Sequence, residues 1–148
     1  MTLTNHMLTG AIIGATVSSY WIAAPAALLS HIVLDVMPHY GFEGARERLR
    51  KTFTSFWFVM VFDAAFVALL LSLLAFTGRV ELIVFAVIAA SPDFIWIHMF
   101  RTGRFEDKPY RNLVLKFLKN IQQFESPKAI VVDIVYGIAA AYVLYSVV

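Results

Sequence analysis

Apolar residues dominate five segments of the chain, and two polar stretches and two short turns separate these segments. A helix needs about 20 consecutive apolar residues to cross a bilayer, and the third segment has that length, whereas the first two are shorter. Pro25 suits the first turn of the second segment. The pattern predicts an all-α fold in one domain over residues 1–148, an integral membrane bundle of about five apolar helices. These helices are expected at Met7–Ile22, Ala24–Met37, Phe56–Phe76, Val80–Ile97 and Ala129–Val148.

The two polar stretches cover Gly41–Ser55 and Met99–Lys128. Within the second, Tyr110–Phe124 (YRNLVLKFLKNIQQF) places its apolar residues at helical spacing on one face, with the basic residues largely off that face. Such a segment is typical of an amphipathic helix that lies on a membrane surface. A helix that packs on the protein itself would show the same pattern, so both alternatives stay open here.

The composition favours lipid as the surrounding solvent. The chain is 60% hydrophobic and 15% charged, whereas soluble domains are nearer half apolar. The absence of cysteine excludes disulfides, thiolate metal sites and cysteine nucleophiles. Membrane lipid is the expected partner, no nucleic acid is expected, and the oligomeric state is left open.

Basic residues are distributed unequally between the two sides of the predicted bundle. The stretches after the second and fourth segments would share one side and carry 11 of the 12 Lys and Arg residues, while the other side carries Arg79 alone. Positive charge accumulates in cytoplasmic loops. The sequence therefore predicts an inner or plasma membrane protein with a cytoplasmic N-terminus and a C-terminus outside.

Four aspartates lie inside the apolar segments, and all fall near the predicted cytoplasmic face. At a rise of 1.5 Å per residue they lie within roughly 10 Å of that face, together with two histidines. Each charged side chain costs on the order of 2.5–3.5 kcal/mol in a bilayer, so such residues are usually paired and functional. The aspartates are Asp35, Asp63, Asp93 and Asp133, and the histidines are His6 and His31.

A divalent cation would satisfy several of these carboxylates and imidazoles at once. His31 and Asp35 stand four residues apart, on one face of a helix, and His39 extends that stripe if the helix continues through Pro38. The expected ligands are His6, His31, Asp35, His39 and Asp93. Hydrogen bonding between helices is the plainer alternative for each of them.

Two aspartates are left for another role. Asp63 and Asp133 could serve as the general base, or they could orient the ligating histidines. His98 stands five residues from Asp93, off its helical stripe, and is not expected to be a ligand. Ser18, Ser19, Ser30 and Ser91 lack a base and orienting group, so serine nucleophiles are not expected.

The motifs NHMLTGA, SHIVLDVMPHYG and SPDFIW resemble those of the YdjM-like membrane-bound metal-dependent hydrolases. The resemblance covers mainly residues 5–41 and 89–98. It implies a helical bundle related to the zinc phospholipase C and P1 nuclease group, with His6, His31, Asp35 and Asp93 as metal ligands and zinc as the expected ion. The chain departs from the family in two ways. Asp93 is followed by Phe94, Ile95 and Trp96, so the family's second aspartate is absent, and the chain also lacks the HRGxTH element.

The expected function is therefore metal-assisted hydrolysis of an ester or phosphoester, and a lipid is one candidate substrate. The site is expected to open to the cytoplasm. Two rivals stay open. A proton or cation carrier would also keep acids within a membrane, although carriers place their sites near the midplane. A non-catalytic membrane protein could use the same polar or metal cluster to hold its helices together.

Overall fold

The computed structural model describes residues 1–41, 47–95, 113–121 and 124–148, and within these residues the fold is all-α. An isolated parallel bridge between His39 and Glu125 is the only strand-like pairing among them. The α-helices are α1 (Leu3–Thr16), α2 (Tyr20–Val36), α3 (Glu47–Phe76), α4 (Val80–Ala90), α6 (Leu113–Ile121) and α7 (Ile130–Val147), with 3₁₀ turns η1 (Ser91–Asp93) and η2 (Pro127–Ala129).

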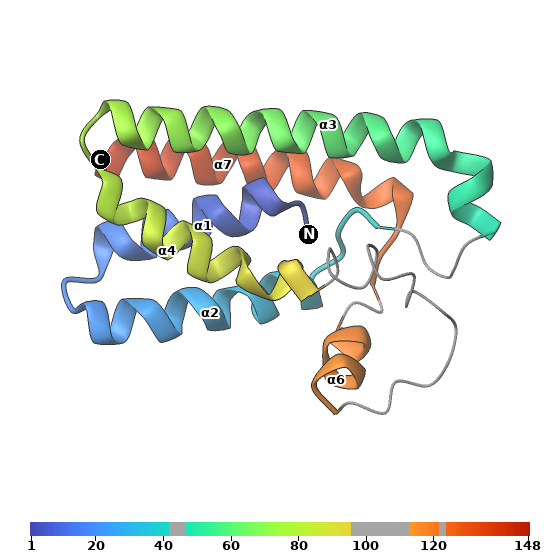
Figure 1. Cartoon of the computed structure of the whole chain (residues 1–148), viewed down its shortest axis with the longest axis horizontal. Helices are drawn as coiled ribbons and strands as arrows, with labels where there is room; N and C mark the ends of the chain where they lie inside the picture. Colours follow the sequence, from blue (N-terminus) through green and yellow to red (C-terminus); the bar gives the residue numbers. More distant parts are fainter. Residues whose placement is uncertain (42–46, 96–112, 122–123) are drawn as a thin grey trace.

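Helix α1 is the centre of the bundle, and α2, α3, α4 and α7 all pack against it (Figure 1). Its apolar side chains Met7, Leu8 and Ala11 are buried and form one core with residues of α3, α4 and α7. A second core joins α2 to α4 through small side chains, among them Ala27 and Ala89. Helix α1 is therefore packed between α2, α3, α4 and α7.

Small residues let α1 and α4 approach closely. A Cβ atom built on Gly10 would collide with the carbonyl group of Phe85 and with the side chain of Ala89. The Phe85 backbone cannot move aside to make room for this Cβ atom, as a flexible side chain could. Glycine is therefore required here for packing, although it costs about 1 kcal/mol of helix propensity relative to alanine.

The helices share one polar end. The N-terminal ends of α1, α3 and α7 lie toward the same end of the bundle as the C-terminal ends of α2 and α4, and α6 lies beside that end (Figure 1). The turn from α3 to α4 and the C-terminus lie at the other end, where Gly78 has a positive φ of 74°. The sequence predicts this alternation from the order of the apolar segments.

The prediction of an all-α bundle is confirmed, but the expectation of five membrane-length helices is wrong. Among the described residues, only two helical stretches are long and apolar enough to cross a membrane: Trp57–Phe76 in α3, and Pro127–Val147, which runs from η2 through α7. Helices α1, α2 and α4 have 14, 17 and 11 residues. At 1.5 Å per residue they reach about 21, 26 and 17 Å, short of a hydrocarbon layer of about 30 Å.

The helix boundaries differ from the predicted ones for local reasons. Helix α2 begins at Tyr20 and includes Pro25. The break between α1 and α2 lies before this helix, at 17–19, where the backbone of Val17 and Ser19 is extended. Helix α4 ends at Ala90 because Pro92 converts its continuation into the 3₁₀ turn η1. Helix α3 begins at Glu47, inside the basic stretch. Helix α6 falls within the predicted amphipathic segment, whose residues 110–112 and 122–123 lie outside the described part.

The contact between α1 and α4 gives a first prediction. We expect Gly10→Ala to destabilise the bundle by about 1–3 kcal/mol, because the added methyl must push α1 away from α4. Thermal unfolding in detergent measures the change. The control is Ala68→Val, which adds carbon atoms at an exposed position of α3. A Gly10→Ala protein that melts at or above the wild-type temperature would contradict the close packing.

Candidate metal centre

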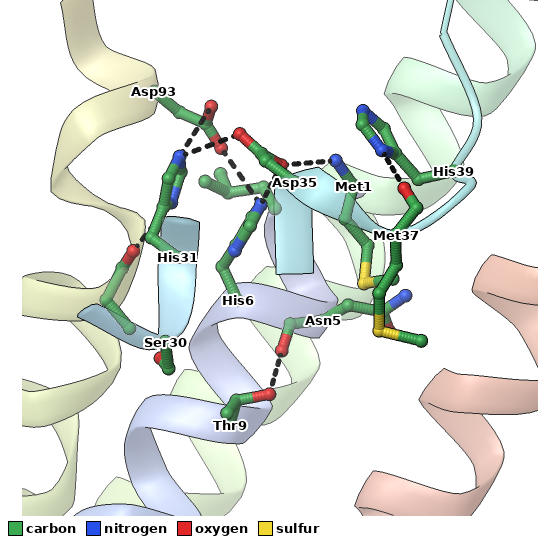
Figure 2. Close-up of polar contacts among 12 residues, drawn as sticks. Met1, Asn5, His6, Thr9, Ser30, His31, Asp35, Met37, His39 and Asp93 are labelled. Atoms are coloured by element: carbon green, nitrogen blue, oxygen red, sulfur yellow. Dashed lines mark hydrogen bonds and ion pairs between the residues drawn. The ribbon is translucent and has the colours of Figure 1, made fainter. Parts of the chain in front are cut away.

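Four side chains from three parts of the chain converge at the polar end of the bundle. His6 lies on α1, His31 and Asp35 lie on the last two turns of α2, and Asp93 ends η1. Each offers one nitrogen or oxygen atom, and these four atoms lie within 4.8 Å of one another. Figure 2 shows the two imidazoles and the two carboxylates facing one another. The structure thus unites four of the five ligands that the sequence predicts.

Both imidazoles face both carboxylates at similar distances. The Nε2 atom of His6 lies 3.2 Å from Asp35 Oδ1 and 3.9 Å from Asp93 Oδ2. The Nε2 atom of His31 lies 3.2 Å from Asp35 Oδ2 and 3.7 Å from Asp93 Oδ1. Ligand atoms of a tetrahedral zinc ion, each bound at 2.0–2.2 Å, lie about 3.4 Å apart. The four measured separations bracket that value, so the donor set fits such an ion.

The ring of His31 is oriented by the backbone of α4. Its Nδ1 atom lies 2.8 Å from the carbonyl oxygen of Ala89, to which it donates a hydrogen bond if it carries the ring proton. In a 3₁₀ turn that carbonyl would accept from residue 92, which is proline and has no N–H. A proton on Nδ1 leaves the Nε2 atom with a free lone pair that points at the carboxylates. Ligating histidines are usually held in this way by a carbonyl or a carboxylate.

His6 has a different and less satisfied environment. Its side chain is fully buried, and neither ring nitrogen has a hydrogen-bond partner among the described residues; the Nε2 atom of His31 also lacks one. The His6 ring stacks on the His31 ring at a centroid distance of 3.9 Å and an interplanar angle of 19°. Two charged imidazoles would repel each other at that distance. The stacking therefore disfavours a charge on both rings at once, and the neutral ring is the form that binds metal.

Asp35 also contacts the start of the chain. Its Oδ1 atom lies 2.8 Å from the Met1 nitrogen, and its carboxylate is almost fully buried (Figure 2). The two oxygens of Asp35 are thus shared among the Met1 nitrogen and the two Nε2 atoms. Asp93 is the most exposed of the four, at 22% of its side-chain area.

Asp63 caps the N-terminus of α1 from the neighbouring helix α3. Its Oδ2 atom accepts from the backbone N–H of Leu3 at 2.9 Å, and its Oδ1 atom accepts from that of Thr4 at 3.0 Å. The Thr4 hydroxyl donates to the Asp63 carbonyl oxygen. Both carboxylate oxygens are engaged with backbone, so these contacts support a role in positioning α1 and do not support the predicted general base.

Asp133 is likewise held by other groups. The Asn5 side-chain amide donates to the Asp133 carbonyl oxygen at 3.0 Å and lies 3.4 Å from its Oδ1 atom, while the backbone N–H of Tyr40 donates to Oδ2 at 2.9 Å. Asp133 therefore connects α7 with α1, through Asn5, and with the segment that follows α2, through Tyr40. Its role as a base also stays a prediction without a supporting contact.

His39 lies outside the group of four, contrary to its expected place on the ligand stripe. Helix α2 ends at Val36, before Pro38, so the four-residue spacing from Asp35 no longer puts His39 on the same face. Its Nδ1 atom pairs with the Met37 carbonyl oxygen at 2.7 Å, and its Nε2 atom lies 3.7 Å from Glu125. His98 lies outside the described residues.

Sequence reasoning missed one buried polar residue of this end. Asn5 directly precedes His6, is buried, and ties α1 to α7 through Asp133. The Thr9 hydroxyl extends this polar contact by pairing with the Tyr136 hydroxyl at 2.7 Å. The signal available in the sequence was an amide beside a histidine at the start of an apolar helix.

Comparisons with known proteins give no relative for this chain. No family model matches it, and neither a curated protein nor a solved structure does so. The resemblance to the YdjM-like hydrolases therefore stays a prediction from motifs. The geometry of the four side chains carries the functional argument from here on.

The cap on α1 gives the second prediction. We expect Asp63→Asn to destabilise the protein by about 1 kcal/mol, because the amide keeps one acceptor but loses the second acceptor and the charge at a helix N-terminus. Thermal unfolding measures this change. The control is Glu81→Gln, since Glu81 is exposed at the other end of the bundle and pairs only with Arg79 among the described residues. Equal melting temperatures for the two variants would contradict the capping role.

Proposed function

We propose that this protein is a membrane-bound metal-dependent hydrolase whose divalent ion is held by His6, His31, Asp35 and Asp93. The observation that carries the proposal is the set of three buried imidazole nitrogens without hydrogen-bond partners beside two carboxylates. A buried polar atom without a partner costs about 1–3 kcal/mol. A hydrogen-bonded polar cluster would have satisfied these nitrogens, whereas a bound cation gives two of them the partner they lack.

The charges of the site also favour a divalent ion. Two carboxylates in a buried site repel each other, and burial makes that repulsion stronger than in water. One divalent cation balances the charge of both carboxylates. Two imidazoles and two carboxylates are typical ligands for zinc and for neighbouring first-row metals, and zinc is the ion we expect.

The exposed surface supports placement in a membrane. Only 11% of the apolar stretch of α3 and 17% of that of α7 are buried inside the protein, so neither resembles the core helix of a soluble protein. Their large side chains would otherwise face water over a surface far beyond a normal exposed apolar patch. We propose that α3 and α7 cross the bilayer and that the metal centre faces the cytoplasm, the side on which basic residues gather.

The chemistry proposed for this site is hydrolysis of an ester or phosphoester. A bound divalent ion polarises the scissile group and activates water. Two of the chain's groups hold the geometry: the Ala89 carbonyl orients the His31 ring, and the cap by Asp63 fixes the start of the helix that carries His6. Asp93, the most exposed of the four, is the residue that an incoming substrate would meet first.

Metal binding gives the third prediction. Purified wild-type protein should hold about one divalent ion per chain after metal loading, and His31→Ala should lower the affinity by more than about 100-fold, because changes to groups that only orient ligands already cost about 10–100-fold. Elemental analysis and calorimetric titration measure both quantities.

The matched control for this experiment is His39→Asn. His39 is also buried and follows Asp35 by four residues, but it lies outside the group of four. The variant should keep wild-type stoichiometry. A wild-type protein that binds neither zinc nor manganese would refute the metal centre, and the proton-carrier rival would then explain the acids.

Activity gives the fourth prediction. With zinc present, wild-type protein in vesicles should release product from an ester or phosphoester substrate, while Asp35→Asn and His6→Ala should fall to the rate of a chelated sample. His39→Asn should remain active. Metal binding without hydrolysis of either substrate class would favour the third possibility, an ion that only holds the bundle together.

A further inference from the structure

The depth of the metal centre along the bundle can be fixed from its hydrogen bonds. Asp63 accepts from the backbone N–H groups of Leu3 and Thr4, so the start of α1 lies level with Asp63 on α3. Asp63 follows Trp57, the first residue of the apolar stretch of α3, by six positions, or about 9 Å of helix. His6 lies further along α1, which runs in the same direction as α3 (Figure 1). The imidazole of His6 is thus deeper than the edge of that stretch.

Exposed apolar side chains surround the bundle at this depth. Phe62, beside Asp63, is 61% exposed; Ile134, beside Asp133, is 54% exposed; and Val33, between His31 and Asp35, is 62% exposed. These three belong to α3, α7 and α2, so the apolar surface is not confined to one face. The buried acids and the exposed apolar side chains alternate within the same helical turns.

Asp93 is the accessible member of the group of four. Its side chain is 22% exposed, whereas the side chains of His6, His31 and Asp35 are at most 1% exposed. Phe94, which follows Asp93, is 46% exposed. Among the described residues, Asp93 is therefore where a substrate would first meet the centre, beside an apolar side chain.

We propose that the metal centre lies within the hydrocarbon layer and that its substrate is the ester or phosphoester linkage of an anionic bilayer lipid, which meets the centre at Asp93. This proposal rests on the proposed hydrolase function and adds the substrate class to it. Either linkage must move about 9 Å inward from the edge of the layer to reach the level of Asp63, but a lipid is already held in the layer by its acyl chains, whereas a water-soluble ester must leave water entirely. The two polar stretches of the sequence carry 11 of the 12 Lys and Arg residues, and this charge favours an anionic headgroup.

The proposed reaction is a simple hydrolysis. The oxygen of one water molecule bonds to the carbonyl carbon or phosphorus of the lipid linkage, and the bond from that atom to the alcohol oxygen breaks. One proton of the water passes to the departing alcohol. The products are an alcohol and either a carboxylic acid or a phosphate monoester, so no other reactant is required.

The first test measures depth and does not depend on activity. In a background with Trp21, Trp57 and Trp96 replaced by phenylalanine, Phe62→Trp supplies a single fluorophore at the level of the centre. A second protein keeps Trp57 alone as the shallow reference. In vesicles, we expect lipids brominated near mid-chain to quench the Phe62→Trp emission more strongly than that of Trp57. Iodide in the buffer should quench the emission of Trp57 more strongly than that of Phe62→Trp. Stronger iodide quenching of Phe62→Trp would overturn the placement in the hydrocarbon layer.

The second test measures substrate choice. Wild-type protein loaded with zinc is placed in phosphatidylglycerol–phosphatidylcholine vesicles, and hydrolysis of the long-chain phosphatidylglycerol is compared with that of its soluble dibutyryl analogue. We expect kcat/KM to be greater for the long-chain lipid by about tenfold or more, since a single methylene in apolar contact is worth at least that. Glu81→Gln serves as the control variant and should match wild type.

The outcomes separate the two proposals. Equal cleavage of the lipid and the soluble analogue would overturn the lipid substrate and leave the hydrolase standing. Cleavage of phosphatidylcholine at the same rate as phosphatidylglycerol would overturn the anionic headgroup. Cleavage of none of them, in a protein that binds zinc, would refute the hydrolase and the substrate together, whereas the quenching result would still decide the depth of the centre.

Discussion

The structure depends on satisfying the N-terminus of a helix that begins inside an apolar bundle. The first backbone N–H groups of any helix lack partners within the helix, and water normally supplies them. Helix α1 is surrounded by four helices, so its N–H groups at Leu3 and Thr4 turn to the Asp63 carboxylate instead. Asn5 then adds a side-chain contact to Asp133. These contacts set the height and rotation of α1, and with them the place of His6.

The same cap explains why the aspartates divide into two groups. Asp63 and Asp133 hold backbone and amide groups, whereas Asp35 and Asp93 face imidazole nitrogens. All four lie on apolar helices near one end, and hydropathy alone treats them alike. Only the tertiary contacts distinguish a carboxylate that completes a helix end from one that could bind a cation. The positioning pair holds the helix that carries His6, whose ring has no hydrogen bond of its own among the described residues.

Much of this arrangement could be predicted from the sequence. The alternating order of apolar segments fixes which helix ends meet, and the four-residue spacing of His31 and Asp35 places both on one face of α2. The predicted place of His39 failed because Pro38 follows the end of α2. The boundary between α1 and α2 was not predicted because Ser18 and Ser19 interrupt the apolar run only briefly. The hydrogen bond from His31 to Ala89 joins residues 58 positions apart, and no local pattern reveals it.

The short helices are what make the site possible. A helix that crosses the whole layer has its ends in water, where solvent satisfies them, but α1, α2 and α4 are too short to do so. In the proposed placement their ends meet inside the apolar layer: the N-terminus of α1, with its positive partial charge, and the C-terminal turns of α2 and α4. The positive end of α1 favours the surrounding carboxylates. Helix α4 ends at Ala90, before Pro92, and this leaves the Ala89 carbonyl for His31. In this proposed placement the two long helices hold the bundle in the membrane, and the three short ones supply the polar ends that form the candidate metal centre.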